Sequence, residues 1–222
     1  MVETTEPVVE EEKQIVEEKQ IVIVNNIQSN LEKEDHLRAL TLYGDITEQK
    51  ASDTVAALLY MQSTSEYSYL VDPEDPDSDV KTAKRPLKLY VSTHGGSASE
   101  MFSIFDIMSM IKKDTCEIET YGVGKVMSAG VPILAAGTKG KRYIGKNCRV
   151  MLHNVMGGYH GNILSLENEL EEIKWIQDRY IDCLAKNTKL TKKKLKKILK
   201  TQTDVYISAK QAIKYGIADK II

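Results

Sequence analysis

Three residues that lie far apart in the chain belong to segments suited to hydrolytic chemistry. Ser128 stands among small residues in the segment Gly124–Gly130, a pattern typical of a strand, a tight turn and the start of a helix. His153 ends an apolar run that predicts a strand, and Asp204 precedes a predicted helix. A serine nucleophile, a histidine base and an orienting aspartate form the catalytic triad that recurs on unrelated folds. The chain order serine, histidine, aspartate also narrows the choice of fold.

Each of these three residues also has an ordinary structural explanation. A helix N-cap would account for Ser128, a structural role at a strand end for His153, and a turn for Asp204. Each residue alone is therefore weak evidence for a site. Their combination with these flanking segments favours a serine hydrolase, because free backbone N–H groups at the start of a helix stabilise negative charge.

A fourth segment contains a pair of glycines, Gly95 and Gly96, in a turn suited to binding an oxyanion. The phosphate-loop motif, in which a glycine is followed, after four intervening residues, by Gly-Lys-Ser or Gly-Lys-Thr, is not found there. His94 adjoins this turn and is a second candidate for lining a site, whereas His36 and His160 rank lower. Because no pair of histidines has the spacing of metal ligands, the sequence predicts no metal site and no cofactor.

Composition limits the class of protein. The 222 residues suit one domain with tails, and a hydrophobic fraction of 42% supplies a sizeable core. A net charge of −2 argues against nucleic acid as a partner. Apolar runs fall short of the ~20 residues that span a bilayer, so we expect no membrane partner. Three cysteines without paired spacing suit a reducing compartment, and we expect a cytoplasmic location.

Charge is distributed unevenly along the chain. Residues 66–79 hold six acids and no base, and residues 186–200 hold eight lysines and no acid. Solvated, mutually repelling surface is the ordinary explanation for such runs. Electrostatic docking of other subunits or partners is the alternative. The lysine run has Leu195 and Ile198 at helical spacing and lacks aromatic residues, which favours a solvated helix face over a nucleic-acid site.

Predicted strands and helices alternate along the chain, which indicates an α/β fold. The predicted strands are Leu40–Tyr43, Leu87–Val91, Glu117–Tyr121, Arg142–Ile144 and Arg149–Leu152. The predicted helices are one from the Thr47 cap to Gln62, Ala98–Ile111, Ala129–Ala136, a long helix from Ile163 to Leu184, a lysine-rich helix capped by Thr191, and a short helix with a Ser208 capping box that ends at Gly216.

Four ranges describe the expected domain organisation. Residues 1–26 are an acidic, flexible tail, in which a six-residue unit is repeated. Residues 27–222 form one domain. Within it, residues 63–85 are a long, polar, acidic loop with two Asp-Pro pairs, and residues 157–185 hold a glycine-rich segment followed by the long helix.

The stretch from about Leu37 to Ile222 resembles the proteolytic subunit of the ATP-dependent Clp protease, a serine peptidase. Four motifs carry the resemblance, in order and with spacing like that of the family. They are Met127–Gly130 followed by Ala135–Arg142, Asn147–His153, Gly157–Gly161 with the helix after it, and Asp204–Ala209 followed by Ala212–Asp219.

The resemblance implies a fold, a site and an assembly. The fold would be the crotonase-like ββα spiral with a protruding handle helix. Ser128 would be the nucleophile, His153 the general base and Asp204 its orienting acid, and the backbone N–H groups of Gly96 and Ala129 would form the oxyanion hole. Seven subunits would form a ring, two rings would enclose a chamber, and an AAA+ unfoldase would feed it unfolded polypeptides. The chain itself contains no ATP-binding motif.

The chain departs from the family pattern at several positions. His94 stands where proline is usual, Met127 and Ala129 differ from the usual flanks of the nucleophile, and Thr203 replaces an arginine. The loop over residues 63–85 is longer than usual. Such divergence suits a specialised member, for example one encoded by a virus.

Three alternative functions follow from these departures and from the wider superfamily. The first is a non-catalytic or regulatory subunit that joins rings of another protein, and the complete serine, histidine and aspartate set argues against it. The second is a crotonase-fold enzyme acting on acyl-thioesters. The third is a viral capsid-maturation or signal-peptide peptidase.

Overall fold

The computed structural model describes residues 37–114, 116–158, 160–200 and 203–222. The expected tail over residues 1–26 lies outside these ranges, as does His36. The described chain divides into two compact units. One contains residues 66–85, and the other contains residues 38–65 and 86–222. The larger unit carries all the candidate site residues.

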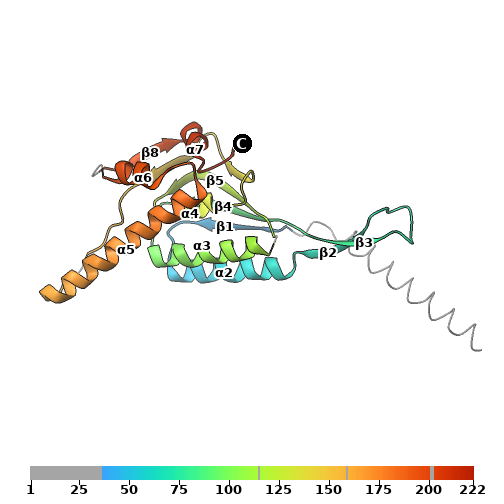
Figure 1. Cartoon of the computed structure of the whole chain (residues 1–222), viewed down its shortest axis with the longest axis horizontal. Helices are drawn as coiled ribbons and strands as arrows, with labels where there is room; N and C mark the ends of the chain where they lie inside the picture. The colour runs from blue at the N-terminus through green and yellow to red at the C-terminus, as the bar shows by residue number, and fades with distance from the viewer. Residues whose placement is uncertain (1–36, 115, 159, 201–202) are drawn as a thin grey trace, which may run out of the picture. The chain divides into compact units, whose positions relative to one another are not determined.

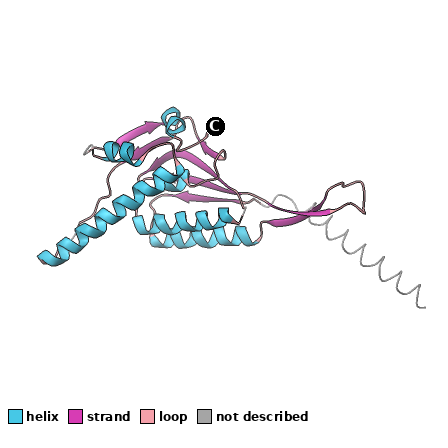
Figure 2. Cartoon of the chain, viewed as in Figure 1, coloured by secondary structure: helices cyan, strands magenta, loops and turns pink. Residues whose placement is uncertain are grey.

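A mostly parallel sheet forms the centre of the larger unit (Figure 2). Its main path runs β1-β4-β5-β6-β9, β7 pairs with both β5 and β8, and only the β7–β8 pair is antiparallel. The strands of this sheet are β1 (Ala39–Tyr43), β4 (Leu87–Thr93), β5 (Ile118–Met127), β6 (Arg142–Ile144), β7 (Arg149–Leu152), β8 (Val205–Ser208) and β9 (Lys220–Ile221). The predicted α/β class is therefore confirmed.

Strand β5 changes partner along its length. Its first half pairs with β6, and its last three residues pair with β7. The register against β4 shifts between Val91 and Thr93, where Gly124 has a left-handed φ of 64°. Such a bulge bends and twists a strand. The bend turns the end of β5 toward β7, so the residues that follow these two strands emerge side by side.

Six helices are present in the described ranges (Figure 1). Helices α2 and α3 lie side by side against one face of the sheet, and α5 extends well beyond the sheet. They are α2 (Glu48–Ser63), α3 (Ala98–Lys113), α4 (Gly130–Ala135), α5 (Ile163–Asn187), α6 (Lys192–Leu199) and α7 (Ala209–Tyr215). None of these helices combines the length and apolar character needed to cross a membrane.

Local sequence signals explain where several helices begin and end. The Thr191 side chain accepts a hydrogen bond from the Lys194 N–H, and Ser208 forms the predicted capping box with Gln211. Gly216 ends α7 in a left-handed conformation, with a φ of 70°. The structure confirms these three predictions. They could be made from the sequence because capping involves residues only three or four positions apart.

The core lies between the sheet and helices α3 and α4. Alternate residues of β4, such as Leu87, Leu89 and Val91, are fully buried, while Lys88 between them is exposed. Helix α3 supplies Met101, Ile104, Phe105, Met108 and Ile111 from one face, and all six residues of α4 are buried. With only two Phe and one Trp in the chain, Ile, Leu, Val and Met fill this core.

A β-hairpin occupies the range where the sequence predicted a long loop. Strands β2 (Glu66–Leu70) and β3 (Val80–Lys84) are antiparallel and pair residue for residue. The two Asp-Pro pairs lie in the tip, where the carboxylates of Asp72 and Asp75 accept hydrogen bonds from the N–H groups two residues on. The prediction of a loop is correct for the acidic, proline-containing tip between the two strands. It is wrong for Glu66–Leu70 and Val80–Lys84, which form the two strands of the hairpin.

One buried ion pair joins the end of the chain to the sheet. The Arg142 side chain is almost fully buried and donates to both carboxylate oxygens of Asp219, at 2.8 and 2.6 Å. It also donates to the carbonyl oxygens of Ala135 and Asn187. Burial raises the pKa of Asp219, but hydrogen bonds from Arg142 and from the Gly140 N–H outweigh it, and the pKa lies below its usual value.

Asp219→Asn should destabilise the protein by about 3 kcal/mol at pH 7, because the buried Arg142 would lose its anion. Urea unfolding of both proteins measures this difference. Since the pKa of Asp219 is depressed in the folded state, its contribution is complete above its unfolded pKa of about 3.9 and is lost as pH falls through the folded value. The difference should therefore shrink below about pH 4. A difference that stays constant down to pH 2 would contradict this explanation.

Candidate active site

Ser128 occupies a strained turn between β5 and α4. Its φ of 51° is the only positive φ of a non-glycine residue in the described ranges. Such a conformation costs on the order of 1–3 kcal/mol and persists only where the surroundings hold it. Here the Ser128 N–H donates to the Met151 carbonyl oxygen, and the Ser128 carbonyl oxygen accepts from the Val131 N–H at 3.0 Å. The turn lifts the serine side chain out of the strand, in the manner of a nucleophile elbow.

The His153 side chain contacts Ser128 directly. His153 follows β7, and β7 lies parallel to the end of β5 with Met127 opposite Met151. The two strands therefore end at the same edge of the sheet. The His153 Nε2 atom lies 2.6 Å from the Ser128 Oγ. With the ring proton on Nδ1, Nε2 accepts a hydrogen bond from the serine hydroxyl, which is the geometry of a nucleophile and its base.

Asp204 lies behind the imidazole, but at a longer distance. It precedes β8, which pairs antiparallel with β7 so that Val205 lies opposite Leu152. This register brings Asp204 next to His153. The Asp204 Oδ1 atom is 3.9 Å from the His153 Nδ1, beyond hydrogen-bond distance, and its side chain is half exposed. The structure thus brings all three predicted residues together, with Ser128 and His153 in contact and Asp204 adjacent to them.

The glycine turn approaches Ser128 from β4. Gly95 and Gly96 have φ values of 109° and 147°, which favour glycine. A Cβ atom on Gly95 would lie 2.7 Å from the Ser128 Cβ. The turn is held by Ile46, whose N–H donates to the Gly95 carbonyl oxygen and whose carbonyl oxygen accepts from the Ser97 N–H. Only glycine permits this approach, so the strand, the turn and the serine form one rigid unit.

Two backbone N–H groups near Ser128 are available to a ligand. In the described part of the chain, the N–H groups of Gly96 and Ala129 donate to no backbone or side-chain acceptor. Ala129 is the N-cap residue of α4, where backbone donors have no partner within the helix. These are the two predicted oxyanion-hole donors, and both residues line the same cavity as Ser128 and His153.

A cavity of about 380 Å³ opens beside the serine and the histidine. Its wall includes several residues that sequence reasoning did not assign to a site. The lining residues are His94, Gly96, Ser97, Ala98, Met101, Ser128, Ala129, His153, Asn154, Val155, Met156 and Tyr180. Met101 and Tyr180 lie within two of the predicted helices, and the sequence assigned neither of them to a site. His94, the second candidate from the sequence, does line this cavity, whereas His160 is exposed and is not among its lining residues.

Tyr180 fixes the serine from the side of α5. Its hydroxyl donates to the Ser128 carbonyl oxygen at 3.2 Å, alongside the bond from the Val131 N–H. Burial raises the pKa of this hydroxyl far above its usual value, so the group stays protonated and remains a donor. Two donors on one carbonyl oxygen help to hold Ser128 in its strained conformation.

Tyr180→Phe should lower kcat by about tenfold with little change in KM, because one hydrogen bond that holds the serine is lost while the ring stays in the cavity wall. Steady-state cleavage of a fluorogenic peptide gives both constants. Tyr215→Phe, in α7 and outside this cavity, is the matched control. A rise in KM at constant kcat would instead assign Tyr180 to substrate binding alone.

Other nucleophiles and metal sites have less support. Burial raises the pKa of the Cys148 and Cys183 thiols to about 11, so neither forms a thiolate readily near neutral pH. Among the residues that the structure describes, no group of three or more His, Cys, Asp and Glu residues could hold a metal ion. The arrangement at Ser128 is therefore the strongest candidate for chemistry in this chain.

The fold is α/β, and a serine and a histidine lie in contact at the carboxyl ends of adjacent parallel strands. The family model of the Clp protease matches residues 78–222, well over half of the chain. The chain belongs to the Clp protease family. Family membership confirms the resemblance drawn from the sequence, and it indicates a protease with polypeptide substrates and an assembly of subunits.

Proposed function

We propose that this chain is a serine endopeptidase subunit that hydrolyses peptide bonds of unfolded polypeptides inside an oligomeric chamber. The observation that carries the proposal is the 2.6 Å separation of Ser128 Oγ and His153 Nε2, in a chain of the Clp protease family. Two free N–H groups beside the serine and a cavity that reaches both side chains add support.

In the proposed reaction, Ser128 Oγ attacks the scissile carbonyl carbon while His153 Nε2 takes the hydroxyl proton. The N–H groups of Gly96 and Ala129 donate to the oxyanion, and loss of one such donor typically costs about 10²–10³ in turnover. His153 then gives its proton to the leaving amine. Water enters, transfers a proton to His153 and attacks the carbonyl carbon of the acyl-serine. As the bond from that carbon to Ser128 Oγ breaks, His153 returns the proton to Oγ, and the second product leaves as a carboxylic acid. Asp204 orients the imidazole and stabilises its cation.

The Asp204 Oδ1 and His153 Nδ1 atoms, which are 3.9 Å apart, must move closer together to form the hydrogen bond of a complete triad. A shift of about 1 Å brings the two atoms into hydrogen-bond range. Catalytic hydrogen bonds are often long in the absence of substrate and tighten when it binds. We therefore infer that substrate binding or assembly with other subunits completes the triad.

Cleavage of an unfolded protein tests the proposed function. A permanently unfolded, fluorescently labelled polypeptide should be degraded to short peptides by the native chain, and Ser128→Ala should leave it intact. A stably folded protein that carries the same label should resist degradation until an AAA+ unfoldase and ATP are added, because the chain carries no ATP-binding motif. Equal degradation by the native chain and by Ser128→Ala would refute a serine peptidase.

We further propose a double-ring assembly, of two heptamers, in which helix α5 pairs facing rings. The first half of α5 exposes several large apolar side chains: Ile163 is 74% exposed, Leu164 is 72% exposed, and Leu166 and Leu170 follow at helical spacing. Such a stripe is costly in water and is usually covered by a partner. A cytoplasmic location is part of the proposal, because the three cysteines, all of which the structure describes, form no disulfide.

Replacing both Leu166 and Leu170 by Glu should halve the particle mass, because like charges would then face one another between the rings. Multi-angle light scattering measures this mass directly. Glu167→Gln on the same helix is the matched control and should leave the mass unchanged. An unchanged mass in the double variant would refute the pairing role of α5.

A further inference from the structure

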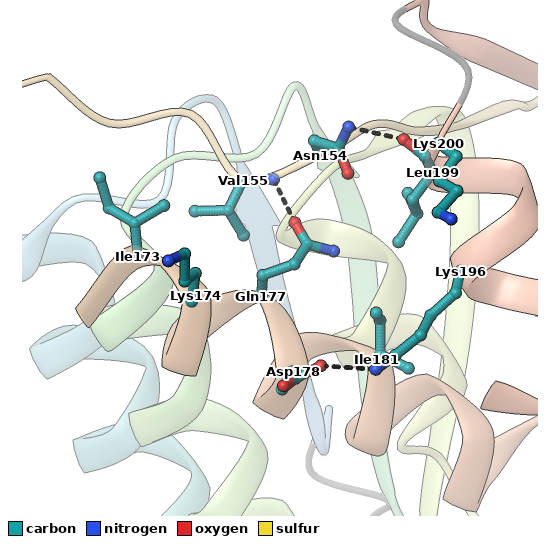
Figure 3. Close-up of a pocket in the computed structure, with 10 residues that line it drawn as sticks. All are labelled: Asn154, Val155, Ile173, Lys174, Gln177, Asp178, Ile181, Lys196, Leu199 and Lys200. Atoms are coloured by element: carbon teal, nitrogen blue, oxygen red, sulfur yellow. Dashed lines mark hydrogen bonds and ion pairs between the residues drawn. The ribbon is translucent and has the colours of Figure 1, made fainter. Parts of the chain in front are cut away.

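A second cavity, of about 670 Å³, lies next to the candidate active site (Figure 3). Residues of helices α5 and α6 and of the segment after β7 line it. Its lining residues are Asn154, Val155, Ile173, Lys174, Gln177, Asp178, Ile181, Lys196, Leu199 and Lys200. Asn154 and Val155, which directly follow His153, line both cavities. A polypeptide bound at Ser128 can therefore extend a side chain into this second cavity.

The Gln177 side chain presents a hydrogen-bond donor to this cavity. Its Oε1 atom accepts a hydrogen bond from the Val155 N–H at 2.7 Å, and this contact fixes the orientation of the amide. The amide nitrogen is consequently directed away from Val155, toward the space between Asn154 and Leu199 in Figure 3. This nitrogen is buried and has no acceptor in the described part of the chain. A buried donor of this kind favours a ligand that carries an acceptor.

The charges around the cavity are predominantly positive. Lys196 is paired with Asp178 at 3.1 Å, which neutralises both. Lys174 and Lys200 also line the cavity, and neither forms an ion pair with a described residue. The walls between these charges are apolar, with Val155, Ile173, Ile181 and Leu199. The cavity thus combines an apolar wall, a buried N–H donor and two ammonium groups that pair with no acid among the described residues.

We propose that this cavity is a specificity subsite for an acidic side chain, foremost glutamate, of the polypeptide substrate. The carboxylate accepts a hydrogen bond from the Gln177 amide and pairs with Lys174 or Lys200, while the methylene groups of glutamate contact Ile173, Ile181 or Leu199. The neutral amide of glutamine fits the same space without the charge interaction. The subsite rests on the proposed peptidase function, because it takes its ligand from a polypeptide bound at Ser128.

Peptide cleavage tests the subsite without depending on absolute activity. Each of a set of internally quenched peptides carries one Glu, at a different position around a fixed cleavable bond, and a matched peptide carries Gln there. At one position the Glu peptide should have a kcat/KM about tenfold above that of the Gln peptide. This ratio should fall as salt concentration rises, because the lysines are exposed.

Two substitutions should change the preference for glutamate, one by reversing it and the other by weakening it. Gln177→Glu retains the acceptor for the Val155 N–H but replaces the buried donor with a carboxylate, so the Gln peptide should become the better substrate. Lys200→Met removes one ammonium group and should reduce the ratio. Lys194→Met, on α6 but outside the cavity, should leave it unchanged. Circular dichroism and thermal unfolding establish that each variant is folded.

Binding by the inactive full-length Ser128→Ala protein provides a second readout, with fluorescence anisotropy of the same Glu and Gln peptides. A Glu/Gln ratio near one in both assays would overturn the subsite, as would a ratio that survives in both Gln177→Glu and Lys200→Met. If the Gln peptides are cleaved by the native chain and not by Ser128→Ala, the peptidase function stands and only the subsite falls. If no peptide is cleaved or bound, both proposals fail.

Discussion

His153→Ala is expected to lower kcat/KM for peptide cleavage by at least about 10⁴-fold, with little change in the stability of the protein. The His153 Nε2 atom lies 2.6 Å from the Ser128 Oγ, and no other described base lies within hydrogen-bond distance of that hydroxyl. Without the imidazole, the serine keeps its proton near neutral pH and is a weak nucleophile. Steady-state cleavage of a fluorogenic peptide, with thermal unfolding of the same samples, measures both quantities.

His160→Ala is the matched control for this experiment. His160 is exposed and lies outside the cavity at Ser128, so its loss should leave most of the turnover intact. Native turnover in His153→Ala would show that another group activates the nucleophile. Equal losses in both variants would point to a general effect on the protein and not to the chemistry at Ser128.

Gly95→Ala should lower kcat/KM by about 100-fold, because it displaces the nucleophile without touching the catalytic side chains. The added Cβ atom would lie 2.7 Å from the Ser128 Cβ and 3.1 Å from the Ala129 nitrogen. The φ of 109° at this position is also unfavourable for alanine. The serine, the Ala129 donor or the glycine turn must therefore move, and each movement disrupts the site.

Gly145→Ala separates this local effect from a general cost of replacing glycine. A Cβ atom there would have its nearest neighbour at 3.7 Å, an ordinary contact, and residue 145 lies in the turn between β6 and β7. Peptide cleavage should be nearly unchanged in Gly145→Ala. If Gly95→Ala cleaved peptides at the native rate, the rigid contact between the glycine turn and Ser128 would have no part in catalysis.

Much of the fold could be predicted because its signals are local. The caps at Thr191 and Ser208 and the stripe of α3 depend on residues within a few positions of one another. Strands β8 and β9 were missed because they are short and form by pairing with strands more than 50 residues away. The hairpin of β2 and β3 was missed because its strands are largely polar, so they lack the apolar alternation that predicts a strand.

The candidate site was predictable to a similar extent. The order of the motifs predicted Ser128, His153 and Asp204 as site residues. The register of β5, β7 and β8 explains why these three residues lie close together. The distance between Asp204 and His153 could not be predicted, since it depends on how the segment before β8 packs. The contact between Tyr180 and Ser128 could not be predicted, because Tyr180 lies within a long predicted helix and the partner of its hydroxyl lies 52 residues earlier in the chain.

The proposed function requires Ser128 to be an activated nucleophile. A fluorophosphonate probe, which forms a covalent bond with activated serines, tests this requirement most directly. We expect the assembled native protein to be labelled on the tryptic peptide that contains Ser128, as identified by mass spectrometry, and we expect Ser128→Ala to remain unlabelled. Absence of labelling in the assembled native protein, or equal labelling of Ser128→Ala, would contradict the proposed function.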